Sequence, residues 1–209
     1  GGTVDLYARG IRDTLESQKL LHGQSILAEN RVGAGGAIAL AQLKSMAGNA
    51  HWLGTFHTGA IAGVASGLIK ADLRDFPPVA MLVEETSVVA VRADSPWRSG
   101  TDLVAALRAD PTRARIAVAP ALGQNTHMAI AKPLKAAGVA VDRLTIAPFR
   151  SSGESVTALL GGHVDVVSAT APAVVPFVAD GRLRIIATAA PEPGTGPLKG
   201  IPTWREQGV

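Results

Sequence analysis

The chain has 209 residues, a formal net charge of +3 and no cysteine, which excludes disulfides, thiolate chemistry and cysteine-ligated zinc. With 47% hydrophobic and 18% charged residues, the composition indicates a globular core of one large domain or two smaller ones. Aromatic residues make up only 4%, and no basic run exceeds a dipeptide, which argues against a nucleic-acid-binding face.

The first part of the chain combines helical and extended patterns. Apolar residues recur at helical spacing between Val4 and Leu15 and predict an amphipathic helix over residues 4–21. The other elements expected here are strands at 24–28 and 51–56, helices at 37–47 and 58–68, and extended runs at 79–83 and 87–91. Asp75-Phe76-Pro77-Pro78 breaks the chain before the extended runs.

The alternation restarts at Ser99, which has the spacing of a helix cap with Asp102. The elements expected from here are strands at 115–119, 144–147, 164–168 and 183–189, and helices that follow 99–102, span 127–137, begin near 153 and span 172–179. Alternating strands and helices predict an α/β fold with largely parallel sheets.

Two such blocks predict two lobes joined by two strands, near 87–92 and 184–189. Residues 1–92 and 190–209 are expected to form lobe one, and residues 93–189 lobe two. Ligands of such folds bind where loops leave the carboxyl ends of strands. The loops expected at a common cleft are residues 1–3, 56–60, 119–125 and 148–152. Each precedes a predicted helix N-terminus, whose partial positive charge suits a carboxylate.

A glycine cluster, Gly33-Ala34-Gly35-Gly36, lies between a predicted strand and a predicted helix. Glycines at such a junction let the backbone turn tightly and aim N–H groups at an anion. The spacing does not fit a nucleotide loop, because Ile38 stands where a dinucleotide fingerprint has its third glycine, and no Gly-Lys-Ser/Thr follows. The spacing favours a tight turn.

No group of residues predicts catalysis, a metal site or a cofactor. The five histidines lack the spacing of a helical zinc site, and no Gly-x-Ser-x-Gly nucleophile elbow occurs. Asp165 is expected to begin a strand and not to act in catalysis. His127, at a predicted helix start, could line a ligand site or face solvent. Arg150 could pair with an acidic ligand or extend along the surface, and Ser151 is expected to cap a helix and could also touch a ligand.

Residues 29–36 read Glu-Asn-Arg-Val-Gly-Ala-Gly-Gly, which resembles the Glu-Asn-Arg-Pro-Gly-Ala-Gly-Gly signature of Bug-type solute-binding proteins. These are the extracytoplasmic receptors of tripartite tricarboxylate transporters (TctC-like proteins). Other segments resemble the family in order and spacing: residues 1–5, 8–9, 75–80, 148–150, 159–165, 181–184 and 201–203. The resemblance therefore covers essentially the whole chain.

The resemblance implies a two-lobed periplasmic binding protein of type II topology, with mixed sheets and a two-strand hinge (a Venus-flytrap architecture). It implies a periplasmic, monomeric receptor without a cofactor that captures a dicarboxylate, an amino acid or an aromatic acid. Its partners would be the small organic acid and the membrane subunits of the transporter, with no nucleic acid and no enzymatic activity. Carried over by position, the implied ligand contacts are Gly1, Gly2, Thr3, Thr58, Gly59 and Ala60 in lobe one, and Gly123, Gln124, Asn125, Ala169 and Thr170 in lobe two.

The chain departs from the family pattern at two places in the expected site. Ala119 and Pro120 replace two hydroxyl residues of the lobe-two loop, and Ala169-Thr170 replaces a frequent Asp-Asn pair. Both changes make the expected pocket more apolar, and the second makes it less acidic. The family's strand before Gly1 and its helices after Val209 are missing, so the chain is expected to be part of a longer receptor.

Two other functions are weighed against the receptor. A LysR-type regulator uses a ligand-sensing effector domain of the same fold, which would require an N-terminal helix-turn-helix that this sequence does not contain. An enzyme on an α/β scaffold is a more distant alternative, because no catalytic motif supports it. In the receptor, the glycine cluster at residues 33–36 is expected to shape the entry into a helix and not to contact the ligand.

Overall fold

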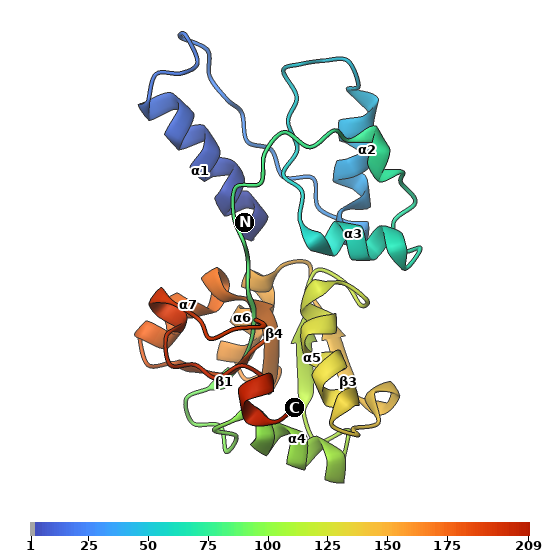
Figure 1. Cartoon of the computed structure of the whole chain (residues 1–209), viewed down its shortest axis with the longest axis vertical. Helices are drawn as coiled ribbons and strands as arrows, with labels where there is room; N and C mark the ends of the chain where they lie inside the picture. The colour runs from blue at the N-terminus through green and yellow to red at the C-terminus, as the bar shows by residue number, and fades with distance from the viewer. Residues whose placement is uncertain (1–2) are drawn as a thin grey trace. The chain divides into compact units, whose positions relative to one another are not determined.

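The structure is a computed structural model that describes residues 3–209 (Figure 1). The chain divides into two compact units, the first ending at Ala80 and the second running from Met81 to Val209. The expected ligand contacts Gly1 and Gly2 lie outside the described residues. Among residues 3–209, no helix combines the length and the apolar character needed to cross a membrane.

The first unit is helical in its described part. Its elements are α1 (Thr3–Ser17), η1 (Ala34–Gly36), α2 (Ala37–Ser45), α3 (Thr58–Ala65) and η2 (Leu73–Asp75). A small core of buried Leu40, Ala60 and Ile69 joins α2, α3 and the segment after α3. The predicted helices are therefore present, and those expected at 4–21 and 58–68 end earlier than predicted.

The strands predicted at 24–28 and 51–56 are wrong, and residues 79–83 form no strand either. A strand is maintained by hydrogen bonds to a neighbouring strand, and none of these segments has such a partner within residues 3–209. Their apolar side chains are accordingly exposed: Leu27 is 81% accessible, Leu53 69% and Val79 83%. An apolar run in the sequence indicates that a segment is able to form a β-strand, but the strand forms only where the fold brings a second strand beside it.

The glycine cluster forms a tight turn before α2, as its spacing predicted. Gly33, Gly35 and Gly36 have φ angles of 132°, 65° and 104°, a region that side chains disfavour. The Gly36 N–H donates to the Gly33 carbonyl at 3.0 Å. A Cβ on Gly33 would lie 2.6 Å from Ile38 Cδ1, the end of a half-exposed side chain that can move aside, so the backbone angle and not space requires glycine there.

The second unit is built on a five-stranded mixed sheet in the order β3-β2-β4-β1-β5. The strands are β1 (Ser87–Arg92), β2 (Arg115–Val118), β3 (Thr145–Pro148), β4 (Val166–Thr170) and β5 (Leu183–Thr188). Strand β2 pairs in parallel with β3 and β4, whereas β1 is antiparallel to both β4 and β5. The α/β class and the mixed sheet are therefore confirmed, with β1 as the antiparallel exception to an otherwise parallel sheet.

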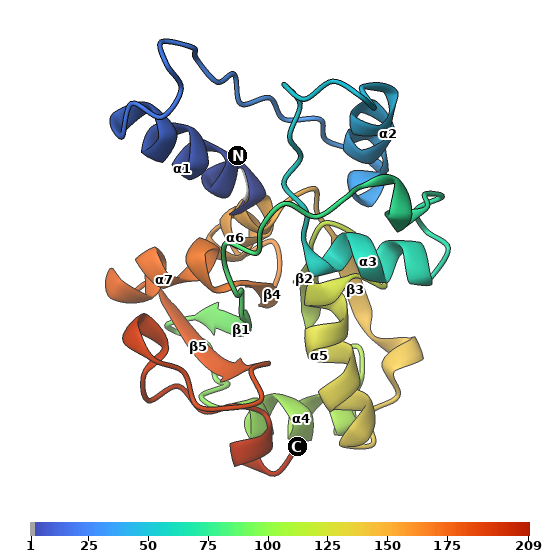
Figure 2. The same ribbon diagram turned by 45° about the horizontal axis from the view of Figure 1, so that its top comes forward.

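Helices cover both faces of this sheet (Figure 2). They are α4 (Gly100–Ala109), α5 (Asn125–Ala136), α6 (Ser152–Leu160) and α7 (Ala171–Ala179). Successive residues of a strand point to opposite faces, so Val89 and Val91 of β1 pack with α4 and α5, while Val88 and Ala90 pack with α6 and α7. Burial on both faces explains why these strands are almost uniformly apolar.

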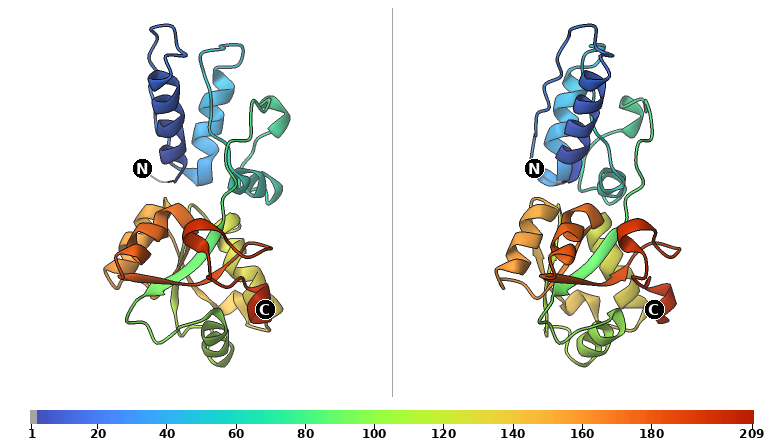
Figure 3. Two further views of the ribbon diagram at one scale, coloured as in Figure 1. Left: turned by 60° about the vertical axis from the view of Figure 1, so that its left-hand side comes forward. Right: turned by 90° about the vertical axis from the view of Figure 1, so that its left-hand side faces the viewer.

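The C-terminal segment also packs on the second unit, beside α4 (Figure 3). Trp204 is buried in the core with α4 and α5, and its Nε1 donates to the Ala129 carbonyl at 3.2 Å. The Gly100 N–H at the start of α4 donates to Gln207 Oε1 at 2.7 Å. The observed division thus differs from the expected lobe boundaries, because β1 pairs within this sheet and residues 190–209 pack on it.

Candidate functional site

Three loop-to-helix junctions lie at one edge of the second unit's sheet. Strands β2, β3 and β4 are neighbouring and parallel, so their carboxyl ends share an edge. Each strand is followed by the N-terminus of a helix, α5, α6 and α7 respectively. Helix N-termini present free N–H groups and a partial positive charge. This edge therefore has the electrostatic character that an anionic ligand requires.

The loop between β2 and α5 is fixed by buried side chains. The Thr126 hydroxyl accepts from the Ala119 N–H at 3.1 Å and donates to the Ala119 carbonyl. The Ser168 hydroxyl of β4 donates to the Thr126 carbonyl at 2.6 Å. Gln124, an expected ligand contact, is fully buried and precedes Asn125, the first residue of α5. The two ends of the loop are thus bonded to each other, and the start of α5 is bonded to β4, which gives the loop a defined shape.

His127 lies in the first turn of α5 and bonds back to this loop. Its Nδ1 accepts from the Gly123 N–H at 2.9 Å. Burial lowers the pKa of His127 below its ordinary value, which favours the neutral imidazole. The Gly123 N–H, which the resemblance assigns to the ligand, is therefore already bonded in this structure.

The loop between β3 and α6 is organised as a helix cap. The Ser151 hydroxyl accepts from the Glu154 N–H at 3.3 Å, and the Arg150 N–H donates to Glu154 Oε2 at 3.2 Å. The capping role predicted for Ser151 is confirmed. Arg150 is exposed.

The start of α6 is bonded to the end of β4, because the Thr170 N–H donates to the Ser152 hydroxyl at 3.4 Å. Thr170 is the last residue of β4 and directly precedes α7. Ala169 is fully buried in the core that packs on α6 and α7. Of the two expected contacts at this position, Thr170 therefore lies at the sheet edge, while the Ala169 side chain faces the core.

The first unit contains a similar junction at the start of α3. His57 precedes Thr58 as the N-cap, and its Nδ1 accepts from the Gly59 N–H at 3.1 Å. Gly59 and Ala60 are buried, and Thr58 is exposed. Burial lowers the pKa of His57. The sequence analysis missed His57 as a capping residue, although its place directly before Thr58-Gly59 was the available signal. Thr3, the remaining expected contact in this unit, is the first residue of α1.

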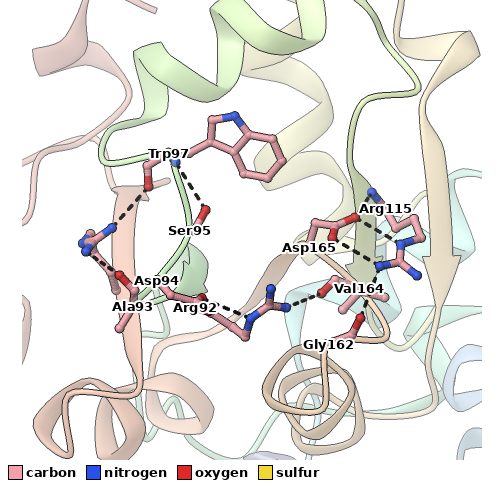
Figure 4. A network of polar contacts seen from close by, with 10 residues as sticks. Arg92, Ala93, Asp94, Ser95, Trp97, Arg115, Gly162, Val164 and Asp165 are labelled. Carbon is pink, nitrogen blue, oxygen red and sulfur yellow. Dashed lines mark hydrogen bonds and ion pairs between the residues drawn. The ribbon is translucent and has the colours of Figure 1, made fainter.

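A separate hollow of about 240 Å³ lies at the opposite edge of the second unit's sheet. It is lined by Arg92, Asp94, Ser95, Pro96, Trp97, Arg113 and Asp165. Figure 4 shows the polar network around it. Arg115 at the start of β2 pairs with Asp165 just before β4, with Nε to Oδ2 at 3.1 Å. Burial raises the pKa of Asp165, but the hydrogen bonds and charge of Arg115 outweigh it and lower the pKa below its ordinary value.

The other contacts of this network stabilise the turn after β1. Arg184 of β5 donates to the Ala93 carbonyl at 2.8 Å and to the Trp97 carbonyl at 3.4 Å. Arg92 pairs with Asp94 at 3.2 Å. The Arg115–Asp165 pair connects the starts of the neighbouring strands β2 and β4, so the expectation that Asp165 has a structural role agrees with its contacts. Within residues 3–209, no three His, Asp or Glu side chains are grouped as metal ligands would be.

Comparisons with known proteins agree with this architecture. Residues 8–209 match the family model described as the tripartite tricarboxylate transporter family receptor, TctC. The chain is 28% identical over 210 residues to the UPF0065 protein in the gbd 5' region of Cupriavidus necator, covering 100% of this chain and 62% of the relative. It is 28% identical over 212 residues to protein BugT of Bordetella pertussis, covering 100% of this chain and 63% of BugT. The chain thus spans less than two thirds of the length of these relatives.

A solved structure extends the match to three dimensions. The structure of MatC from Rhodopseudomonas palustris with bound malate superposes with a TM-score of 0.83 at 27% identity, covering 100% of this chain and 69% of MatC. The family match favours a transport receptor over the effector domain of a LysR-type regulator. The chain belongs to the receptor family of the tripartite tricarboxylate transporters, the TctC or Bug-type proteins.

Proposed function

We propose that this chain is the ligand-binding part of a periplasmic receptor that captures a small carboxylate and delivers it to the membrane subunits of a tripartite tricarboxylate transporter. The observation that carries the proposal is the edge of the second unit where the N-termini of α5, α6 and α7 follow three parallel strands. The likeness to malate-bound MatC supports the choice of a carboxylate. The receptor acts as a monomer, without a cofactor, without binding nucleic acid and without catalysing a reaction.

Apart from Arg150, the donors proposed at this edge are neutral backbone N–H groups, hydroxyls and amides. A carboxylate bonded by backbone N–H groups, hydroxyls and amides is stabilised without a buried ion pair, whose loss is costly. The proposed contacts are Gly1, Gly2, Thr3, Thr58, Gly59, Ala60, Gly123, Gln124, Asn125, Ala169 and Thr170, with His127, Arg150 and Ser151 as further candidates.

The loop after β2 favours a ligand with an apolar body. Ala119, Pro120 and Ala121 offer no side-chain donors, and Leu122 is 50% exposed in the same loop. An aliphatic or aromatic acid can pack against such a surface while its carboxylate lies at the helix N-termini. We therefore expect acids with unsubstituted carbon chains or rings to bind more tightly than hydroxylated acids of the same length.

Calorimetric titration of the intact protein tests the proposal, with malate, succinate, adipate, glutamate and benzoate as ligands. We expect at least one of these acids to bind, because all carry the carboxylate for which the edge is suited. Failure of every acid to bind would contradict the proposed function.

Gly123→Asp tests the position of the site. The new carboxylate would repel the ligand, so we expect affinity to be lost, while Gly123→Asn, of the same size and without charge, retains more of it. Gly138→Asp is the matched control, because Gly123 and Gly138 share a φ of 80° and Gly138 lies beyond the far end of α5. Undiminished affinity in Gly123→Asp would exclude this loop from the site.

A further inference from the structure

Two histidines occupy backbone N–H groups that the family resemblance assigns to the ligand. His127 Nδ1 accepts from Gly123 N–H at 2.9 Å in the second unit, and His57 Nδ1 accepts from Gly59 N–H at 3.1 Å in the first. An amide N–H has one hydrogen to donate. As long as these bonds exist, neither amide can serve a carboxylate directly.

The bond determines which nitrogen of His127 carries the proton. A ring nitrogen accepts a hydrogen bond only through its lone pair, so Nδ1 is unprotonated and the neutral ring has its proton on Nε2. Within residues 3–209, Nε2 of His127 has no hydrogen-bond partner, and the side chain is partly accessible. His127 therefore presents one N–H donor in the first turn of α5.

The backbone that carries His127 is fixed on both sides of the bond. Thr126, its neighbour, is bonded to Ala119 through its hydroxyl and to Ser168 through its carbonyl. Gly123, which donates the hydrogen bond to the imidazole, lies in the loop before α5 and has a φ of 80°. Releasing the imidazole to free the Gly123 N–H would therefore break a formed bond and gain none for the histidine.

We propose that His127 replaces the Gly123 amide as the ligand-binding donor: the Gly123 N–H orients the ring through Nδ1, and Nε2–H donates to the carboxylate. This inference rests on the proposed function and adds a specificity-determining side chain to it. The Nε2–H of the neutral imidazole requires a hydrogen-bond acceptor, such as a carboxylate oxygen, on the ligand. Because the ring is neutral, it binds a carboxylate without introducing a permanent positive charge. His57 has the same tautomer through Gly59, but it is the N-cap of α3 and is left here as a cap.

His127→Asn distinguishes the role of Nδ1 as an acceptor from the role of Nε2–H as a donor. The asparagine Oδ1 can occupy the position of Nδ1 and accept from Gly123 N–H, while nothing reaches the position of Nε2. His127→Gln supplies an amide N–H at about the distance of Nε2. The matched control is His163→Asn, because His163 is exposed in the turn after α6 and lies outside the proposed site.

Succinate, the unsubstituted diacid of the panel above, is the first probe, titrated by calorimetry into the intact wild type and the variants, and the tightest-binding acid of that panel replaces it if succinate itself does not bind. We expect His127→Asn to weaken binding roughly tenfold or more, as the loss of a hydrogen bond to a charged group does. His127→Gln should recover most of this loss, and His163→Asn should bind like the wild type. The melting temperatures of His127→Asn and His163→Asn should match that of the wild type, since both variants keep an acceptor for the Gly123 N–H.

Imidazole nitrogen NMR supplies a second readout. In the unliganded wild type it should report His127 with the proton on Nε2, and the Nε2 resonance should shift when the acid binds.

Three results would overturn the inference. Wild-type affinity in His127→Asn would show that Nε2–H is not used and that His127 only holds the Gly123 N–H. Tighter binding in His127→Ala, which frees the Gly123 N–H, would show that the imidazole competes with the ligand for that amide. If the wild type binds none of the acids, the proposed function fails and this inference fails with it, whereas the first two results leave the proposed function intact.

Discussion

Replacing Thr126 with valine would test how the loop after β2 obtains its shape. Valine has nearly the volume of threonine but cannot bond to Ala119, whose N–H and carbonyl both contact the Thr126 hydroxyl. Ala119 and Thr126 are each 1% exposed, so water cannot replace the lost bonds. Leaving a buried donor or acceptor unpaired costs about 1–3 kcal/mol. With two groups affected, we expect the free energy of unfolding to fall by about 2–6 kcal/mol.

Urea unfolding followed by tryptophan fluorescence measures this change. Trp97 and Trp204 lie in the core of the second unit, and a Trp52→Phe background removes the tryptophan of the first unit from the signal. Thr126→Ser is the matched control, because it keeps the hydroxyl and loses one methyl group, a change worth about 1 kcal/mol. We also expect the valine variant to bind the carboxylate more weakly, since the two ends of the loop are no longer bonded to each other. If valine destabilises the protein no more than serine does, the buried hydroxyl bonds do not hold this loop.

Two further predictions concern helix caps. Ser99 and Asp102 form a capping box at the start of α4, with the Asp102 N–H donating to the Ser99 hydroxyl at 3.1 Å. Ser99→Ala should lower the free energy of unfolding by about 1 kcal/mol. Ser99→Thr keeps the hydroxyl and should lower the free energy of unfolding by less. Burial lowers the pKa of His57 below its ordinary 6.5, so the unfolded chain takes up a proton before the folded one. The stability contributed by neutral His57 is therefore complete above about pH 6.5 and decreases as the pH falls towards the folded pKa. Denaturation of the wild type and His57→Gln at pH 7.5 and pH 5 should show the difference between them shrinking at the lower pH; a constant difference would mean that His57 does not titrate differently in the folded chain.

The sequence predicted the second unit well because its local patterns agree with its packing. Residues 183–189 read as an apolar strand and form β5, and Ser151 and Ser99 have the spacing of caps and cap their helices. Each of these features depends on residues within a few positions of each other. The first unit was predicted less well, because the segments at 24–28 and 51–56 have strand composition but no neighbouring strand within the described chain.

The candidate site shows the same distinction. Sequence located the loops that precede α5, α6 and α7, and it named His127, Arg150 and Ser151 as possible contacts. It assigned the amides of Gly59 and Gly123 to the ligand, whereas both amides donate to histidines in the structure. A glycine at these positions indicates that the backbone N–H is accessible. The glycine alone does not predict which acceptor the N–H will bond to in the folded chain.

The sequence by itself determined the family, through motifs whose order and spacing extend over the whole chain, and it determined the tight turn at residues 33–36, because only glycine readily adopts the backbone angles found there. Only the tertiary structure decided that residues 190–209 pack beside α4, that β1 runs antiparallel to its neighbours, and that two imidazoles occupy the glycine amides. The physical reason is the range of the interactions. Backbone angles and helix caps depend on adjacent residues, whereas strand pairing, core packing and the partner of a buried N–H depend on residues that the fold brings together.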